Sequence, residues 1–346
     1  MSDDGPFEIE LVEAPGTEWD LQAAGLEGAG LFHRAGWLQL WREVYGQRSV
    51  GLVARRGGAV CGLLPLVRKK SRLFGRYWVS MPYFDACAAA GSASASLPLL
   101  EGSLQLAREC GDEYVEVRCH AARPWEWACR THKVRVVLDL PGTREAVLQS
   151  FKAKLRSQVN RARREDVVVE CAGAELVPEF WEVYTRKMRD LGSPGHSLRL
   201  FRRLVGLFPD EADVLVVRLG GRCVSGAVLL QDRDTVVIPW AATLSEVNPL
   251  SLNMLLYFEA LGRAVDRGAT RFDFGRTDAD SAHLRFKLQW GGAAQPLHWY
   301  RAATSGGPPP EDVKQSARLE PAARVWRKLP LAVTRFMGPR LVKHFS

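Results

Sequence analysis

Charged side chains gather in residues 271–292, directly after a short strand pattern. Phe272 and Phe274 alternate as residues on one face of a β-strand do, and Gly275 interrupts the alternation. Carboxylates in a loop can accept a proton, and cations can stabilise an anionic group. The types and spacing of these residues indicate a candidate catalytic site, although solvated turn residues and an exposed basic edge would give the same pattern. The charged residues of this stretch are Arg276, Asp278, Asp280, Arg285 and Lys287.

The sequence shows no pattern typical of nucleophilic catalysis or of a metal site. No Ser-His-Asp or Cys-His pattern is evident, and His33 stands alone at the start of a helical segment, where a capping or packing role is usual. The 7 cysteines are odd in number and contain no Cys-x-x-Cys pair. This usage is typical of free thiols in a reducing compartment and not of a disulfide framework or a zinc site. We therefore expect no metal ion.

The net charge of +8 is concentrated in two segments. Clustered cations of this kind indicate an anionic partner, such as RNA, a nucleotide-linked substrate or an anionic membrane surface. The first segment has no acid and contains Lys152, Lys154, Arg156, Arg161, Arg163 and Arg164. The second has Glu320 alone against Arg318, Arg324, Arg327, Lys328, Arg335, Arg340 and Lys343.

The length of 346 residues suits one large domain or two of ordinary size. No apolar run approaches the length of a membrane span. The start of the chain, Met1-Ser-Asp-Asp-Gly-Pro6, lacks the basic start and apolar core of a signal peptide. We expect a cytoplasmic protein, with peripheral attachment to the inner membrane left open.

Two parts of the sequence repeat one order of elements. Residues 50–67 and 214–230 each form a predicted hairpin, because the pairs Gly57-Gly58 and Gly220-Gly221 supply the positive φ of a tight turn. A third strand, a helix and a fourth strand follow each hairpin, at 77–81, 97–109 and 114–118 and again at 235–241, 251–267 and 271–276. The repeat predicts two copies of one mixed α/β (α+β) unit, packed as a pseudo-dimer.

We expect the first unit to span residues 1–140 and the second to span residues 141–303. The second unit would begin with an amphipathic helix at 144–165, which carries the first group of cations on its polar faces. An exposed structural helix usually mixes charges of both signs. Cations without any acid therefore favour a binding surface over a merely solvated face.

Residues 304–346 form a separate tail. Ser305-Gly-Gly-Pro-Pro-Pro310 indicates a linker, and residues 325–345 mix apolar and basic side chains. Pro330 and Pro339 exclude one continuous helix and leave two short amphipathic segments. Two interpretations stay open: the tail rests on an anionic bilayer, where each cation contributes ~1 kcal/mol, or it packs on the protein body.

Five sequence blocks in a fixed order carry a family resemblance. Together with the hairpin–strand–helix–strand order, they resemble the FemAB family, whose fold is two tandem GNAT acyltransferase units. Within that family they are similar to the branch associated with exosortase (PEP-CTERM) and exopolysaccharide systems. The likeness covers about residues 31–300. The blocks are Lys152-Ala-Lys-Leu-Arg-Ser-Gln-Val-Asn-Arg161, Met188-Arg-Asp-Leu-Gly-Ser-Pro194, Asn253-Met-Leu-Leu-Tyr257, Phe272-Asp-Phe-Gly-Arg276 and Arg285-Phe-Lys-Leu-Gln-Trp-Gly291.

The resemblance implies an acyl- or aminoacyltransferase. FemAB relatives pass an amino acid from aminoacyl-tRNA to an amine of a peptidoglycan precursor. By this likeness Lys287 would act electrostatically at the acyl or phosphate group near the reaction centre, with support from Arg276 and Arg285. Because no nucleophile–base pair is legible, we expect direct attack by the amine without a covalent enzyme intermediate.

The remaining candidate residues would accept a proton or contact substrate. Asp278, Asp280 and Asp85 are the loop carboxylates that could take the proton of the amine, and the sequence does not rank them. Two loops that would line the cleft, at 81–89 and 282–284, depart from the pattern of the branch, so the choice of acceptor stays open. Candidate substrate-binding residues are Arg276, Arg285, Asn253, Tyr257, Asp85, Lys154, Arg156, Arg163 and Arg164.

The loop before the helix at 251–267 bears on the donor. CoA-binding GNAT domains carry a glycine-rich loop there, whose N–H groups cradle the pyrophosphate. Here the loop, Ser245-Glu-Val-Asn-Pro-Leu-Ser-Leu-Asn253, has no glycine and contains an acid. This favours aminoacyl-tRNA as donor, no bound cofactor, and a nucleotide- or lipid-linked envelope precursor as acceptor. The alternatives are an acyl-CoA-dependent N-acyltransferase and a non-catalytic scaffold of envelope polysaccharide assembly.

Overall fold

A computed structural model describes residues 5–71, 75–310 and 315–345. Met1 to Asp4, part of the N-terminal segment considered above, and the side chain of Arg318 lie outside the described part. The chain divides into two compact units, and each includes segments from distant parts of the sequence. The first unit is Met1–Lys133, Pro296–Asp312 and Lys343–Ser346, and the second is Val134–Gln295 and Val313–Val342.

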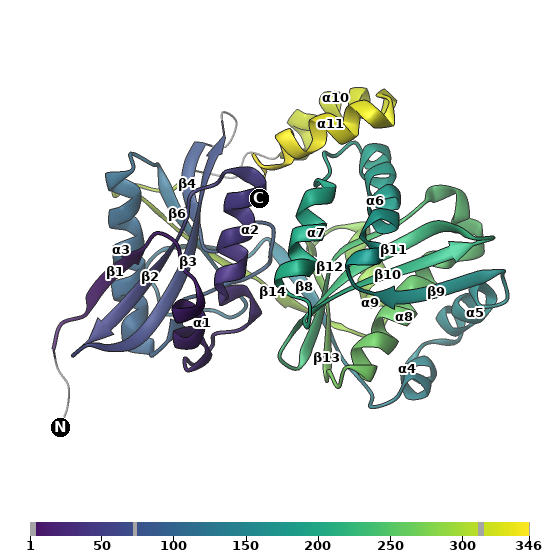
Figure 1. The fold of residues 1–346 in the computed structure, drawn as a ribbon, viewed down its shortest axis with the longest axis horizontal. Coiled ribbons are helices and arrows are strands. Elements are labelled where there is room, and N and C mark those ends of the chain that lie inside the picture. Colours follow the sequence, from purple (N-terminus) through teal and green to yellow (C-terminus); the bar gives the residue numbers. More distant parts are fainter. Residues whose placement is uncertain (1–4, 72–74, 311–314, 346) are drawn as a thin grey trace. The chain divides into compact units, whose positions relative to one another are not determined.

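The first unit is a mixed sheet with helices on both faces (Figure 1). Helix α3 packs on the face that holds Leu52 and Leu64, while α1 and α2 pack on the face that holds Val53 and Leu63. The strand order is β1-β2-β3-β4-β6-β15-β7, and β5 pairs with β3. Its elements are β1 (Glu8–Val12), α1 (Thr17–Ala24), η1 (Leu31–His33), α2 (Ala35–Tyr45), β2 (Ser49–Arg56), β3 (Ala59–Ser71), β4 (Gly75–Val79), β5 (Ala90–Gly91), α3 (Ala93–Glu109), β6 (Tyr114–Cys119), β7 (Ala128–Arg130) and β15 (His298–Ala303).

The second unit has a sheet in the order β14-β8-β13-β12-β11-β10-β9. Helices α6 and α7 cover one face of this sheet and α8 covers the other, with α4 and α5 packed against α8 (Figure 1). Its elements are β8 (Lys133–Asp139), α4 (Arg144–Ser150), α5 (Ala153–Ala162), β9 (Val167–Ala172), η2 (Ala174–Leu176), α6 (Val177–Leu191), α7 (Leu198–Leu207), β10 (Ala212–Leu219), β11 (Arg222–Asp232), β12 (Thr235–Thr243), η3 (Ser245–Leu250), α8 (Leu252–Asp266), β13 (Arg271–Asp278), α9 (Ala282–Leu288), β14 (Ala293–Pro296), α10 (Gln315–Lys328) and α11 (Leu331–Val342).

The predicted internal repeat is confirmed in detail. The hairpin turns have φ of 56° and 79° at Gly57 and Gly58, and 54° and 78° at Gly220 and Gly221. Each hairpin also has a register shift at the matching place, after Ala54 in one and after Val217 in the other. The two halves therefore share backbone irregularities as well as an order of elements, and the predicted mixed α/β fold of two tandem units is correct.

The boundaries of the units differ from the expected residues 1–140 and 141–303. Strand β15 pairs antiparallel with β6 of the first unit, from His298 opposite Cys119 to Ala303 opposite Tyr114. Strand β8 lies in the second sheet, beside β13. Each half of the sequence thus gives one strand to the sheet of the other half. Periodicity along the chain cannot show this exchange, because strand partners are chosen by hydrogen bonding in three dimensions.

The expected single basic helix at 144–165 is two helices, α4 and α5. Phe151 and Lys152 between them are extended, with ψ of 149° at both residues. The bend lets Phe151 enter the core, where its ring centroid lies 5.2 Å from that of Trp290. Burial of an aromatic side chain outweighs the hydrogen bonds of an unbroken helix here.

The tail forms two helices that are separated at Pro330, as predicted, whereas Pro339 lies within α11. Both pack on α6. Arg335 donates to Thr185 Oγ1 at 3.0 Å, pairs with Glu182 and lies over the ring of Trp181. The tail thus packs on the body of the second unit through one side. Its terminal residues belong to the first unit, where the buried Lys69 Nζ donates to the carbonyls of Lys343 and Phe345.

No helix within the described ranges is both long and apolar enough to cross a bilayer. Across the same ranges, no group of three or more His, Cys, Asp or Glu side chains is arranged to hold a metal ion.

Candidate active site

The parallel strand pair of each unit separates at a buried carboxylate. In the second unit β12 and β13 pair from Thr235–Arg271 to Val237–Asp273, and there the pairing stops although both strands continue. In the first unit β4 and β6 pair from Tyr77–Tyr114 to Val79–Glu116. Glu116 and Asp273 hold the same place in the repeat. In the second unit the register of the pair ends at Val237–Asp273, whereas in the first unit the Ser80 N–H just after β4 still donates to the Glu116 carbonyl at 3.0 Å.

Each carboxylate pairs with an arginine from the exchanged strand. Arg301 on β15 binds Glu116 at 2.5 Å, and Arg135 on β8 binds Asp273 at 3.2 Å. Arg118 also binds Glu116, at 2.7 Å. Burial by itself would raise the pKa of Glu116, but the two guanidinium groups outweigh it and hold the pKa below its usual value. These pairs link β6 to β15 and β13 to β8, which are the neighbouring exchanged strands in each sheet.

The two units differ just beyond the carboxylate. In the first, Arg118 points back and donates to the carbonyl of Phe84 at 3.0 Å, while Cys87 forms a β-bridge with Arg118. In the second, the chain bends at Gly275, which has φ of +72°. Asp273 accepts the Gly275 N–H at 2.8 Å and so fixes the bend. A positive φ of this size favours glycine.

Lys287 reaches this bend from α9. Its ammonium donates to the carbonyls of Gly275 at 2.7 Å and Arg276 at 2.8 Å. The segment of Arg285 and Lys287 is thus helical, with Arg285 exposed and Lys287 half-buried. Ser281 caps the helix, since its Oγ accepts the Leu284 N–H at 3.2 Å. The structure therefore brings Lys287 to the end of β13, where the sequence placed the candidate chemistry.

The other charged residues of this stretch are closer to solvent. Asp278 ends β13 and its carbonyl accepts the Ser281 N–H at 3.1 Å. Asp278, Asp280 and Arg285 are exposed, and Arg276 is half-buried. These side chains come from one strand end and one short helix beside Lys287.

Tyr257 and Asn253 lie on α8. The ring of Tyr257 packs between Phe274, Phe286 and Trp290, with centroid separations of 6.0, 5.0 and 5.7 Å. Burial raises the pKa of Tyr257 to about 12. Its ring therefore packs α8 against β13 and α9, so Tyr257 supports the position of α9. Asn253 is half-buried in the first turn of α8.

The cations of α5 divide into two groups. Arg156 donates to the carbonyl of Gln149 at 3.2 Å, and Arg163 lies 3.7 Å from Glu259 and over the ring of Phe258. These two arginines help to hold α5 in place. Lys154 and Arg164 are exposed. They offer positive charge to solvent on the surface of the second unit.

Asp85 belongs to the first unit, unlike the other candidate residues. It lies between β4 and β5, and its carbonyl accepts the Trp299 indole N–H at 3.1 Å. Asp85 is therefore the one candidate carboxylate that does not belong to the second unit.

Arg135 and Gln295 are site residues that the sequence did not indicate. Gln295 on β14 accepts from Arg135 Nη2 at 2.8 Å, beside the pair with Asp273. The available signal was the alternation in Lys133-Val-Arg-Val-Val-Leu-Asp139, which predicts a strand. Its partner strand could not be deduced, because β13 lies far along the chain.

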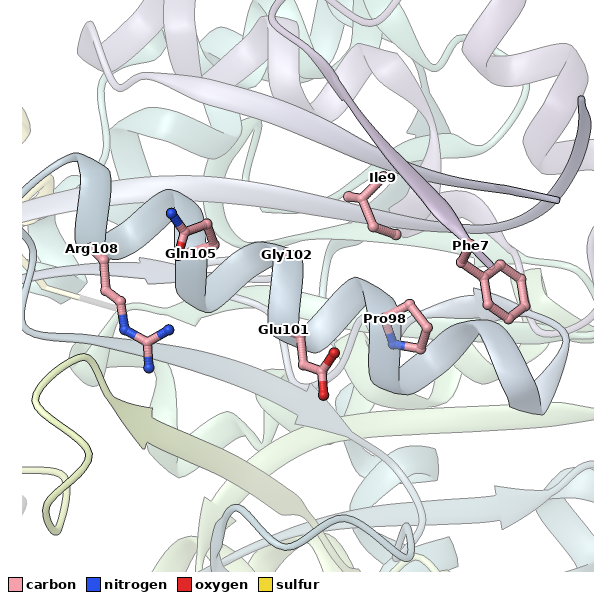
Figure 2. A pocket seen from close by; sticks show the side chains of 7 residues that line it. All are labelled: Phe7, Ile9, Pro98, Glu101, Gly102, Gln105 and Arg108. Atoms are coloured by element: carbon pink, nitrogen blue, oxygen red, sulfur yellow. The ribbon is translucent and has the colours of Figure 1, made fainter. Parts of the chain in front are cut away.

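A groove of about 630 Å³ lies elsewhere, in the first unit between β1 and α3 (Figure 2). Phe7 and Ile9 line it on one side, and Glu101, Gln105 and Arg108 follow one another along α3 on the other. None of the candidate residues named above lines this groove. We do not assign it to the candidate chemistry.

Comparison with protein families identifies the class of the second unit. Residues 149–288 match the model of the acetyltransferase (GNAT) domain. The matched region contains the strand pair β12–β13, the bend at Gly275 and Lys287. The second unit is thus a GNAT domain, and by class the chain is an acyltransferase.

Solved structures extend the likeness to the whole tandem fold. FemX is similar with a TM-score of 0.64 at 15% identity, over 84% of this chain and 97% of that one. L-PGS from Bacillus licheniformis is similar with a TM-score of 0.58 at 11% identity, over 92% and 99%. A tandem GNAT protein from the clavulanic acid biosynthesis pathway is similar with a TM-score of 0.53 at 11% identity, over 88% and 100%. At these identities the likeness shows the tandem GNAT fold. No curated protein matches the sequence.

Proposed function

We propose that this chain is a FemAB-type transferase that moves an aminoacyl group from aminoacyl-tRNA to an amine on a cell-envelope precursor. The observation that carries the proposal is the end of β13, where the strands part after Asp273 and Lys287 is fixed at the bend. The FemAB resemblance and the similarity to FemX support the substrate class. The precursor belongs to peptidoglycan or, by the exosortase-associated branch, to an exopolysaccharide.

The proposed reaction is a direct aminolysis. The neutral acceptor amine attacks the ester carbonyl of aminoacyl-tRNA, a C–N bond forms, and the C–O bond to the ribose breaks. Negative charge grows on the carbonyl oxygen, and the Lys287 ammonium stabilises it. Asp278 or Asp280 accepts the proton of the amine, and the ribose oxygen leaves with a proton.

The donor assignment depends on the loop before α8. This loop is the turn η3, and Glu246 within it pairs with Arg222 at 2.8 Å. A pyrophosphate would meet this carboxylate where a glycine-rich loop would offer N–H groups. The loop therefore disfavours CoA in that position. Exposed cations at Lys154 on α5 and at Arg164, just after that helix, suit the phosphates of a tRNA.

An acyl-CoA-dependent N-acyltransferase is the second candidate, favoured by the match of residues 149–288 to an acetyltransferase domain. It would need CoA to bind without the usual loop.

Ligand stabilisation and product formation separate the candidates. Thermal unfolding of the purified chain is followed with aminoacyl-tRNA, with acetyl-CoA and with a UDP-linked muropeptide. We expect stabilisation by aminoacyl-tRNA and by the precursor, and labelled amino acid in the precursor when both are present. Stabilisation by acetyl-CoA alone would reject the tRNA-dependent function in favour of the second candidate.

A further inference from the structure

Helix α11 has two apolar sides, and only one of them is covered by protein. Thr334, Gly338 and Val342 are four residues apart and buried. A methyl group added at Gly338 would lie 2.9 Å from the carbonyl oxygen of Gly195, so the backbones are in close contact. With the pairing of Arg335 to Glu182, this side fixes α11 on α6.

The rest of the helix surface carries large apolar residues in solvent. Val333, Phe336, Met337 and Leu341 have helical spacing i, i+3, i+4 and i+8, which places them on one side. Phe336 is 63% exposed, and it is the one aromatic residue among the exposed large hydrophobics of the described ranges. We call these four residues the tail face. An exposed apolar set of this kind marks an interaction site.

Positive charge accompanies the tail face. The guanidinium of Arg340 lies 3.9 Å from the ring centroid of Phe336 and donates to the Phe336 carbonyl at 2.7 Å. Lys328, at the end of α10, is exposed. After Glu320 the sequence contains no further acid, and Glu320 itself pairs with Arg327 at 3.1 Å.

We propose that the tail face is a membrane-docking surface that lies on an anionic bilayer, with Phe336 and its apolar neighbours in the headgroup region. Large apolar residues with basic residues beside them are the composition of helices that lie in the interface plane. A second copy is disfavoured as occupant, because a symmetric contact over the tail face would bring two copies of Arg340 into one interface, and the sequence after Glu320 supplies no acid to pair with them. The proposal does not depend on the transfer reaction proposed above.

The surface is already formed on the folded chain. Its helix is held on α6 by the contacts of Arg335 and Gly338, and both helices of the tail stand at the end of α6 in Figure 1. Binding therefore needs no ordering of a disordered segment. Since the four residues of the tail face are exposed, their replacement should leave the fold intact.

Vesicle sedimentation of the full chain tests the proposal. We expect it to sediment with vesicles of mixed phosphatidylcholine and phosphatidylglycerol and to stay in solution with phosphatidylcholine alone. The double variant Phe336→Ser/Met337→Ser should lower the partition coefficient roughly tenfold or more. Arg340→Gln should lower it about fivefold, and salt should weaken binding of the unchanged protein.

Matched variants on other surfaces complete the experiment. Leu21→Ser removes a leucine that is 72% exposed on α1, and Arg202→Gln removes an exposed cation on α7. Both should bind vesicles as the unchanged protein does. Absence of sedimentation with anionic vesicles would overturn the proposal, and so would equal sedimentation of the double variant. If the double variant sediments with vesicles as the unchanged protein does, but is a monomer where the unchanged protein is a dimer, the tail face is assigned to self-association instead.

Discussion

Replacement of Lys287 by methionine separates its electrostatic role from its structural one. The variant keeps the length of the side chain and removes the ammonium that joins α9 to the carbonyls of Gly275 and Arg276. Each lost hydrogen bond costs about 0.5–1.5 kcal/mol net. Because Gly275 and Arg276 are only half-buried, water can replace part of the loss. We expect a fall of about 1–2 kcal/mol in the free energy of unfolding.

The expected effect on catalysis is larger than the effect on stability. Removal of one group that stabilises an oxyanion lowers kcat by about 10²–10³-fold. A loss of about 1–2 kcal/mol in stability shifts the midpoint of thermal unfolding by about 3–6 °C for a unit of this size. The protein would stay folded at the assay temperature. Transfer of labelled amino acid from aminoacyl-tRNA, measured beside the midpoint, reports both quantities.

Asp273→Asn is the matched control for Lys287→Met. It weakens the pair with Arg135 and the support of the Gly275 N–H, but it keeps the Lys287 ammonium. If Lys287→Met keeps kcat within about threefold, the electrostatic role is refuted. If Asp273→Asn lowers kcat as much as Lys287→Met, the geometry of the bend and not the charge explains the loss.

Three further outcomes follow from the described contacts. Glu116→Gln leaves two buried guanidinium groups without their carboxylate and should destabilise the chain by about 3–5 kcal/mol in chemical denaturation. The folded state lowers the pKa of the Glu116 carboxyl. The stability that the ionised carboxylate contributes is therefore present above its ordinary pKa and is lost as the pH falls through the lower pKa of the folded state. Glu116→Gln lacks this contribution, so its free energy of unfolding should fall less in acid than that of the unchanged protein. Lys154→Gln with Arg164→Gln should raise KM for aminoacyl-tRNA and reduce its salt dependence while kcat is kept; an unchanged KM would exclude α5 from tRNA binding. Tyr257→Phe should keep kcat within about threefold, since the contacts to Phe274 and Phe286 come from the ring; a loss of about a hundredfold would give the hydroxyl a direct role.

Local patterns in the sequence determined the repeated unit. Gly57-Gly58 and Gly220-Gly221 adopt the positive φ that their turns require, and Pro330 separates the two helices of the tail. The alternation of Phe272 and Phe274 predicted a strand, and both residues lie in β13, where their rings are buried. These features were predictable because each depends on the conformation of a few neighbouring residues.

Tertiary structure decided the partners of those elements. The exchange of β8 and β15 between the sheets pairs Arg135 with Asp273 and Arg301 with Glu116, across 138 and 185 positions of the chain. The alternation of Phe272 and Phe274 does not decide between a cleft-facing and a structural role for Asp273, whereas in the structure Asp273 is buried and pairs with Arg135. Likewise the sequence did not show that, of the cations around α5, Arg163 lies beside Glu259 and over the ring of Phe258. Local propensity fixes backbone conformation within a few residues, whereas burial and the pairing of charge depend on which distant segments the fold brings into contact.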